Sequence, residues 1–553
     1  MSPLQQPILE NLVNQSIAFI SVFDKTGLAD FARVLVEQYN TVIISTGGTR
    51  KYLAEHQIDS IESAEITGFE ELLGGRVKSL HPHIFAGILA ETTDRENIVR
   101  EKNDLNLPFT IDIVVANLYP FEAERDALKE KNACTSENFD HLLHFIDIGG
   151  SALLRAAAKN YPAVSVLSNC RQYSSFLEEL SNTEGTPSLA FKKRLAYSAF
   201  SLTAYYDGLI AQAFADESTA FLQQTKSTDG PLKQNMGLPD LMGLPLAKIE
   251  DLRYGENPHQ KAALYGVATQ LPDYKCMHGK ALSFNNILDM QAAWQIVVEF
   301  SESYACAIVK HNNPCGVALS ETSVDDAFQR ALDTDPVSAF GGVVAFNDIV
   351  SKAAAKIMHS LFLEVIIAPG FEEDAFDLLS SKKNIRLVTR ELPKPSSQVP
   401  LEFKHVSETL MLVQTVDIEK RREQEKKFAI ATQEKPNPDQ MEDIAFAWKV
   451  VKHCKSNAIV LAKNKKTVGI GAGNTSRIGA LENALKLACD QSKGAVLASD
   501  GFLPHEDNVY AAAQARVGVI VQPGGSIKDG AVISLANENK IAMITTGIRE
   551  FKH

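Results

Sequence analysis

The chain has few cysteines and no long apolar run, and both absences limit what it can be. The seven cysteines among its 553 residues are scattered, and none form a C-x-x-C pair. This pattern argues against a disulfide framework or a structural zinc site and is typical of a reducing compartment. No apolar stretch approaches the roughly 18 residues of a membrane span, and the N-terminus shows no secretory signal. We therefore expect a cytoplasmic protein of the cytosol, with no membrane partner.

The chain also lacks an excess of positive charge. The 55 Lys and Arg residues are outnumbered by 68 Asp and Glu residues, which gives a net charge of −13. Such a chain repels nucleic acid, so we expect no nucleic-acid partner. A phosphate-bearing substrate must instead be attracted by local clusters of Lys and Arg. The length predicts a multidomain protein of enzyme size.

The order of predicted elements indicates an α/β protein. Apolar, β-rich runs at 16–22, 41–45 and 109–117 predict strands, while the patterns at 28–36 and 152–159 predict helices. Strands that alternate with helices predict a parallel sheet with helices on both faces.

Two breaks divide the chain. Residues 223–245 are polar, aperiodic and punctuated by Gly and Pro, so we interpret them as the main interdomain linker. A second break at 393–397 is rich in Pro and Ser and lies within the C-terminal half.

The C-terminal half contains an internal repeat. The two tryptophans, Trp294 and Trp448, share an Ala-Trp-x-x-Val context, and each is soon followed by Ala-Ile-Val. A further match pairs 338–341 with 499–502. A duplicated α/β unit fits this pattern and favours a ligand site between the two copies. Chance similarity is the alternative, because the matches are short.

Lys310 and His311 are the strongest candidates for proton transfer. They end an apolar, strand-like run and are followed by the turn signal Asn312-Asn313-Pro314. Neighbouring strand residues face opposite sides, so both can serve one site only if the strand ends there. A cation beside the imidazole favours its neutral, base-competent form. The alternative is a chance Lys-His pair at a strand end.

Two segments in the first third could bind an anion. Ser45 to Thr49 follow a strand and open a helix with Gly47-Gly48, an arrangement in which backbone N–H groups hold phosphate. Ser21 and Lys25 leave the first strand in a similar position. In 74–83, Arg76 and Lys78 face one side of an extended segment. The alternatives are a tight turn and a solvated loop, and we do not expect His81 and His83 to bind metal.

Other candidates follow strand ends or open helices. Asp147 precedes the helix with Lys159 and is alternatively only its cap. Tyr119 follows a strand end, where sites of open α/β sheets lie. The loop 253–259 gathers a cation, a phenol, an amide and an imidazole, and Arg477 follows a Gly-rich turn.

Taken together, these motifs resemble a known family. They are SVFDKTG at 21–27, ISTGGT at 44–49, GGRVKSLHPH at 74–83, NLYPF at 117–121, DIGGSALLRAAAKN at 147–160, LRYGENPHQ at 252–260, VKHNNPCG at 309–316, SAFGG at 338–342, SNAIV at 456–460 and GIREFKH at 547–553. The chain resembles the bifunctional AICAR transformylase/IMP cyclohydrolases of purine biosynthesis from end to end. It departs from the family's usual pattern at 83–87, including Ala86, and at 550–553, including Lys552.

The resemblance implies a methylglyoxal-synthase-like N-terminal parallel-sheet domain and a C-terminal transformylase of two deaminase-like α/β subdomains. We expect an IMP cyclohydrolase domain at 1–222, with its core at about 10–165, and the linker at 223–245. The transformylase domain at 246–553 then has subdomains at about 246–392 and 401–553. True zinc deaminases need P-C-x-x-C, and Pro314-Cys315 lacks the second cysteine, so we expect no metal.

The resemblance also implies two reactions and their substrates. The chain is expected to transfer a formyl group from the cosubstrate 10-formyltetrahydrofolate to AICAR, and then to close the product FAICAR to IMP with loss of water. His311 is the expected general base, Lys310 the group that protonates the leaving nitrogen, and Asn457 the oxyanion donor. A homodimer is expected. The alternatives are a single-activity enzyme with one decayed half and a nucleotide-sensing module.

The remaining site residues are assigned by the same resemblance. Those expected around the reacting groups of cyclisation are Lys78, Tyr119, Asp147 and Lys159. Those expected at the phosphate end of FAICAR are Ser21, Lys25, Ser45, Gly48, Thr49 and Arg76. Those expected to hold the substrates of formyl transfer are Arg253, Tyr254, His259, Gly341, Arg477, Phe502, Asp507, Asn508 and Arg549.

Overall fold

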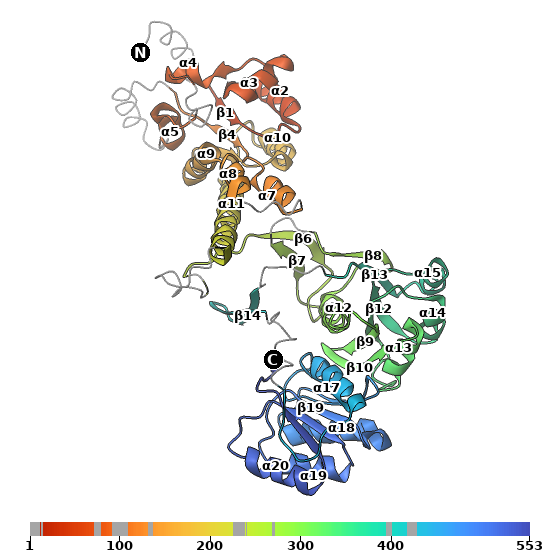
Figure 1. The fold of residues 1–553 in the computed structure, drawn as a ribbon. Coiled ribbons are helices and arrows are strands. Elements are labelled where there is room, and N and C mark those ends of the chain that lie inside the picture. The colour runs from red at the N-terminus through yellow and green to blue at the C-terminus, as the bar shows by residue number, and fades with distance from the viewer. Residues whose placement is uncertain are drawn as a thin grey trace. The chain divides into compact units, whose positions relative to one another are not determined.

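The computed structural model describes residues 12, 15–70, 79–90, 109–130, 136–224, 238, 240–267, 271–393, 401–416 and 428–553 (Figure 1). The predicted basic pair Arg76 and Lys78 lies outside these residues, as does most of the predicted linker. The chain divides into two compact units. The N-terminal unit is Met1–Ala247 with Tyr265–Gln270, and the C-terminal unit is Lys248–Leu264 with Leu271–His553.

The N-terminal unit is built on a parallel sheet, as the sequence predicts. Its strand order is β3-β2-β1-β4-β5. The strands are β1 Ile17–Ser21, β2 Val42–Ser45, β3 Ile61–Glu62, β4 Ile113–Ala116 and β5 Ser165–Leu167. The helices are α2 Leu28–Tyr39, α3 Gly47–Glu55, α4 Ser63–Thr67, α5 Pro82–Leu89, α7 Phe121–Glu130, α8 Ser136–Leu143, α9 Ile148–Lys159, α10 Tyr173–Asn182 and α11 Leu189–Gln224.

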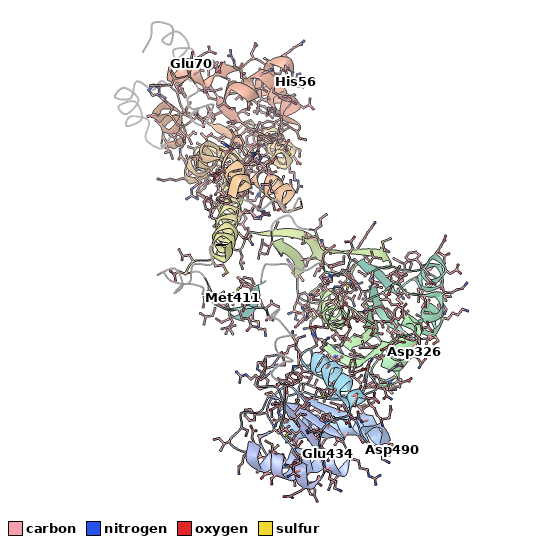
Figure 2. All side chains as sticks on the ribbon, in the orientation of Figure 1. His56, Glu70, Asp326, Met411, Glu434 and Asp490 are labelled. Atoms are coloured by element: carbon pink, nitrogen blue, oxygen red, sulfur yellow. The ribbon has the colours of Figure 1, made fainter. Side chains whose placement is uncertain are left out.

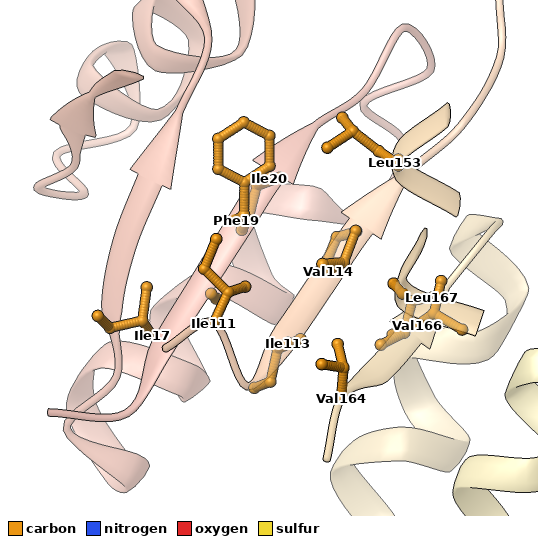
Figure 3. Close-up of a cluster of buried hydrophobic side chains, with 14 of the residues drawn as sticks. Ile17, Phe19, Ile20, Ile111, Ile113, Val114, Leu153, Val164, Val166 and Leu167 are labelled. Carbon is orange, nitrogen blue, oxygen red and sulfur yellow. The ribbon is translucent and has the colours of Figure 1, made fainter. Parts of the chain in front are cut away.

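The central strands are buried on both faces, which explains their continuous apolar sequences. Phe19 of β1, Val114 of β4 and Leu153 of α9 are fully buried in one cluster (Figure 3). A strand covered on both faces needs apolar residues at every position, and β4 supplies Ile-Val-Val-Ala. Helix α11 extends to Gln224 and so includes the first two residues of the predicted linker.

The C-terminal unit contains a 12-stranded sheet in the order β16-β21-β20-β19-β17-β18-β10-β9-β11-β12-β13-β8. The first copy consists of β8 Tyr274–His278, α12 Phe284–Val297, β9 Tyr304–Lys310, β10 Asn313–Ser320, α13 Val324–Leu332, β11 Gly342–Phe346, α14 Lys352–His359, β12 Leu363–Ala368, α15 Glu373–Ser380 and β13 Arg386–Arg390. The second consists of β16 Ala429–Ile430, α17 Pro438–Val451, β17 Ile459–Lys463, β18 Lys466–Gly471, α18 Arg477–Ala488, β19 Val496–Ser499, α19 Asp507–Gln514, β20 Val519–Gln522, α20 Asp529–Glu538 and β21 Ala542–Thr545.

This order confirms the duplication predicted from the tryptophans. Each copy runs helix, hairpin, helix and three further strands, and the copies meet where β10 pairs with β18. Trp294 of α12 and Trp448 of α17 lie in one apolar core that spans both copies. The other face of each copy has a core of its own. Successive side chains of β9 therefore alternate between two cores. Ala307 lies in the core shared by both copies, and Ile308 lies in the core of the first copy alone.

The register of the predicted repeat is wrong in two places. The hairpin turns superpose Lys310 on Lys463, which shifts the Ala-Ile-Val match by two residues. Residues 338–341 precede β11, whereas Ser499 is the last residue of β19, so 338–341 and 499–502 are not equivalent. The equivalent positions are Asn347 and Asp500. Their Oδ1 atoms accept the N–H of Ala305 at 2.7 Å and of Ala458 at 3.1 Å.

Smaller elements complete the described chain. β6 Leu246–Leu252 pairs with β7 Ala262–Val267, and β14 Leu401–Ser407 pairs with β15 Leu410–Thr415. The β14–β15 hairpin presents exposed side chains that include Met411 (Figure 2). Within the described ranges, the search for a helix apolar and long enough to span a bilayer finds none.

Candidate active sites

The turn between β9 and β10 carries the expected general base. His311 and Asn312 have φ values of 53° and 61°, so the two form a two-residue hairpin turn of the kind that requires positive φ. The predicted turn is therefore one residue too late, because His311 lies within it and Pro314 lies in β10. Leaving the strand frees the His311 side chain from strand alternation. As a result, Lys310 and His311 line one pocket.

This pocket has a volume of about 250 Å3 and is bordered by both copies of the duplication. From the first copy come Lys310, His311 and Cys315, and from the second come Ile470 and Ala472. The Lys310 Nζ donates to the Phe340 carbonyl at 2.8 Å, which fixes the ammonium at the pocket edge. Burial raises the pKa of the Cys315 thiol to about 12, so Cys315 is neutral near pH 7.

Asn457 lies in a hydrogen-bonded segment beside this turn. Asn313 connects the two, since its Oδ1 accepts the N–H of Lys455 at 2.9 Å. The Asn457 Oδ1 accepts from Arg477 Nη2 at 2.8 Å, and its Nδ2 donates to the Asn474 carbonyl at 3.0 Å. Arg477 thereby fixes the amide with its NH2 group turned away from the guanidinium. An amide NH2 has two donors, so a second N–H is available to a reacting oxygen.

Arg477, expected to hold substrate, begins α18 and is buried. Its side chain is only 6% exposed, and it forms an ion pair with Asp500, whose side chain is 0% exposed. It also donates to Ser499 Oγ at 2.8 Å. The substrate contact expected for Arg477 stays a prediction. In the structure, the guanidinium holds Asn457.

The C-terminal tail contacts the segment that holds Asn457, and the sequence did not predict this contact. The N–H of Ser456 donates to the Lys552 carbonyl at 2.9 Å, and the N–H of Glu550 donates to the Asp500 carbonyl at 2.9 Å. Arg549 stands over the Phe551 ring at 4.9 Å and is exposed. The closing motif GIREFKH was the available signal in the sequence. Its contact with the Asn457 segment forms only in the folded chain.

The other residues expected in formyl transfer lie on loops and helix ends of the same unit. Arg253, Tyr254 and His259 share the β6–β7 loop, where the Arg253 guanidinium stacks on Tyr254 at 5.0 Å. That loop contacts α12, because Asn285 Nδ2 donates to the Glu256 carbonyl at 3.2 Å. The loop therefore contacts α12, the helix whose Asp289 accepts the His311 N–H.

The expected folate contacts are only partly accessible. Phe502 is 41% exposed, whereas Asn508 is 1% exposed. Asp507 opens α19 and accepts from the Asn508 backbone and Nδ2, both at 2.7 Å. Gly341 has a φ of 74° and donates to the Phe362 carbonyl at 2.7 Å, so this position favours glycine for backbone reasons.

In the N-terminal unit, three of the predicted residues lie at the carboxyl edge of the sheet. Ser21 ends β1, Ser45 ends β2, and Tyr119 follows β4. Helix α3 begins at Gly47, and its N–H groups from Thr49 onward donate within the chain, beginning with the bond from Thr49 to the Thr46 carbonyl at 2.9 Å. The N–H groups of Gly47 and Gly48, the first two of the helix, have no intrahelical acceptor. A Cβ on Gly48 would meet nothing within 4 Å, so there is open space at this helix start. These features suit an anion at the position predicted from the Gly-Gly turn.

Several hydroxyl groups predicted to hold the phosphate have partners inside the fold. Ser45 is fully buried, and its Oγ donates to Ser60 Oγ at 3.2 Å. Thr49 Oγ1 accepts the Val22 N–H at 3.2 Å. The phosphate-binding roles of Ser45 and Thr49 stay predictions, with each hydroxyl already making one hydrogen bond inside the fold. Ser21 Oγ is half-buried and lies 3.1 Å from Thr46 Oγ1.

Asn117, which sequence reasoning missed as a single residue, orders the loop after β1. Its Oδ1 accepts the N–H groups of Phe23 at 2.6 Å and Asp24 at 3.1 Å, and its Nδ2 donates to the Asp24 carbonyl at 2.8 Å. Lys25 lies in this loop, with Nζ on the Phe23 carbonyl at 3.1 Å. The Asn of the NLYPF motif was the available signal.

Asp147 and Lys159 lie at opposite ends of α9. Asp147 caps the helix, because its Oδ1 accepts the Gly150 N–H at 2.6 Å, and its N–H donates to Tyr206 Oη at 2.9 Å. Twelve residues at about 1.5 Å each separate the helix ends by about 18 Å. Lys159 precedes β5 by a short loop and so lies toward the amino edge. Within one chain, the length of α9 thus separates Lys159 from Asp147, and the role expected for Lys159 stays a prediction.

A parallel-sheet unit with open space at the start of α3 and a duplicated unit with a pocket lined by Lys310 and His311 indicate an enzyme of two domains. Family models support this division: the "AICARFT/IMPCHase bienzyme" model matches residues 157–487, and the "MGS-like domain" model matches residues 27–139. The chain belongs to the AICARFT/IMPCHase bienzyme family.

Curated relatives match nearly the whole chain. The bifunctional purine biosynthesis protein PurH of Caldicellulosiruptor saccharolyticus is 44% identical over 542 residues, covering 97% of this chain and 99% of the relative. PurH of Aquifex aeolicus is 44% identical over 548 residues (97% and 100%), and PurH of Bacillus subtilis is 43% identical over 541 residues (97% and 99%). The chain is a bifunctional purine-biosynthesis enzyme with AICAR formyltransferase and IMP cyclohydrolase activities. Neither the single-activity alternative nor the sensing alternative receives support.

Proposed function

We propose that formyl transfer takes place at the pocket beside the β9–β10 turn, with 10-formyltetrahydrofolate as the cosubstrate. The observation that carries this assignment is the placement of Lys310 and His311 on one pocket, beside the segment of Asn457, whose Lys455 N–H donates to Asn313 Oδ1. A base, a cation and an amide donor are the groups that acyl transfer to a weak nucleophile requires.

The chemical steps assign one role to each of these residues. The AICAR amine is a weak nucleophile, because its lone pair is delocalised into the imidazole-carboxamide. It attacks the formyl carbon while His311 accepts its proton. The second Asn457 N–H donates to the oxyanion of the tetrahedral intermediate. When the carbon–nitrogen bond to the folate breaks, Lys310 supplies the proton that the leaving nitrogen needs.

Cyclisation belongs to the N-terminal unit in this proposal. The FAICAR phosphate binds at the start of α3 near Gly48, with Ser21 and Lys25 beside it. The carboxamide nitrogen attacks the formyl carbon, and the tetrahedral adduct loses water to form the second ring. Tyr119 and Asp147 act on these reacting groups, and the family resemblance adds Arg76 and Lys78. Asp147 must then perform two functions, since it also caps α9.

The family resemblance further suggests a homodimer in the cytosol. The free cysteines of the described chain agree with a reducing compartment. No part of either mechanism above requires a metal ion.

The test is to supply AICAR with 10-formyltetrahydrofolate and to separate FAICAR and IMP chromatographically over time. FAICAR should appear first and IMP should follow. A parallel reaction without the folate should give neither product, and FAICAR supplied alone should still give IMP. Formation of IMP from AICAR without the folate would contradict the proposal.

A further inference from the structure

A carboxylate on α12 holds the turn that contains His311. Asp289 Oδ2 accepts the His311 N–H at 3.3 Å, and Asp289 Oδ1 accepts the Asn312 N–H at 2.6 Å. Both turn residues have positive φ, a conformation that non-glycine residues adopt only when their surroundings favour it. One carboxylate that accepts both N–H groups supplies such a surrounding.

The second copy contains the same arrangement. Asp443 of α17 accepts the Asn464 N–H at 2.9 Å and the Lys465 N–H at 2.6 Å. These two turn residues each have a φ of 55°. Asp289 and Asp443 are each the sixth residue of their helix, five residues before its tryptophan. The duplication therefore conserves the carboxylate and the turn but changes the residues that the turn presents.

The two turns serve different surroundings. In the second copy, the turn residue Lys465 forms ion pairs with Glu321 at 2.7 Å and Glu442 at 2.8 Å, so the side chain of this turn has a structural role. In the first copy, His311 lines the pocket. Within the described ranges, its imidazole has no hydrogen bond or ion pair. The backbone of the turn, which sets the direction of the Cα–Cβ bond, is therefore one determinant of where this ring points.

We propose that Asp289 is the positioning residue for the His311 general base, acting through the two backbone N–H groups of the turn. Without its carboxylate, the turn can relax toward negative φ, which changes the direction of the His311 Cα–Cβ bond and moves the imidazole from the reacting amine. A displacement of about 1 Å costs about 100-fold in rate. The inference rests on the proposed role of His311.

The test compares three variants of the full-length chain: Asp289→Asn, Asp443→Asn and His311→Ala. Asparagine retains one acceptor oxygen but presents a donor to the other N–H, so it preserves the side-chain shape while disrupting the paired acceptance. We expect Asp289→Asn to lower kcat for formyl transfer about 10- to 100-fold, with KM for AICAR changed less than about threefold. Cyclisation of supplied FAICAR by the same chain should be unchanged.

Asp443→Asn is the matched control, because it disrupts the same arrangement in the copy without the base. It should lower the melting temperature at least as much as Asp289→Asn and leave formyl transfer near wild type. Equal loss of formyl transfer in both Asp variants, or wild-type kcat in Asp289→Asn, would overturn the inference. His311→Ala separates the two levels of argument. If His311→Ala retains formyl transfer, the proposed role of His311 fails. If His311→Ala loses formyl transfer but Asp289→Asn keeps a wild-type kcat, only the positioning role of Asp289 is refuted.

Discussion

Removing the Arg477 guanidinium should destabilise the C-terminal unit strongly. The substitution Arg477→Ala leaves Asp500, 0% exposed, without its ionic partner. Breaking a buried ion pair from one side costs about 3–5 kcal/mol. Asp500 retains hydrogen bonds from Ser456 Oγ and the Ala458 N–H. We therefore expect the lower end of that range, about 3 kcal/mol.

Urea unfolding followed by tryptophan fluorescence measures this loss directly. Both tryptophans of the chain, Trp294 and Trp448, lie in the C-terminal unit, so the signal reports that unit alone. The control is Lys352→Ala, which removes an ion pair with Asp374 that is exposed on both sides. Its unfolding midpoint should match wild type. A loss below about 1 kcal/mol for Arg477→Ala would refute the argument from burial.

Arg477→Lys separates charge from geometry. A lysine restores a cation for Asp500 but has no planar fork that reaches Asp500, Ser499 and Asn457 together. Part of the stability should return, whereas kcat for formyl transfer should stay at least about tenfold low, because the Asn457 amide is no longer held. Full recovery of kcat would show that Arg477 does not orient Asn457.

Three further predictions concern the N-terminal unit and the division of the chain. Asp147→Ala should abolish cyclisation and lower stability by about 1 kcal/mol through loss of the cap. Asp147→Asn can still cap the helix and should therefore lose cyclisation alone. An Asn variant that is both stable and active in cyclisation would limit Asp147 to capping. Hydrogen bonds from Thr26 lower the pKa of Asp24 from 3.8. The ionised Asp24 carboxylate therefore contributes fully to folding stability above its unfolded pKa, and this contribution is lost as the pH falls through the lower folded pKa. Asp24→Asn should therefore be slightly less stable than wild type at pH 6 but equal to it at the acid limit, and a deficit that persists in acid would contradict this reasoning. Residues 1–224 and 246–553, expressed separately, should fold, the first cyclising FAICAR and the second formylating AICAR in a dilution series; aggregation of either fragment would place the boundary elsewhere.

Local sequence signals predicted the elements whose conformation depends on local chemistry. The strand at 16–22 and the helix at 152–159 have burial patterns that their own residues determine, and both are present as β1 and α9. The carboxyl-edge location of Tyr119 also followed, because it depends only on the strand order rule for open α/β sheets. The tryptophan repeat was found because a large buried residue is retained at the same place in each copy.

Long-range contacts decided the features that the sequence could not predict. The turn begins at His311 because Asp289, 22 positions earlier, accepts its N–H. The position of Ser45 at a strand end was visible in the sequence, whereas its hydrogen bond to Ser60 was not. Lys159 was grouped with Asp147 by motif, although a helix separates their positions. The tail that reaches Ser456 from Lys552 joins residues 96 positions apart.

The central claim is that one chain has two independent sites, and mixing two variants tests it most directly. His311→Ala and Asp147→Asn are each supplied with AICAR and 10-formyltetrahydrofolate, first separately and then together. Alone, His311→Ala should form no FAICAR, since loss of a general base costs about 3–5 kcal/mol in the barrier, and Asp147→Asn should accumulate FAICAR without IMP. Together they should produce IMP, because FAICAR released by one variant is cyclised by the other. Failure of the mixture to form IMP, or IMP formation by His311→Ala alone, would contradict the two-site account.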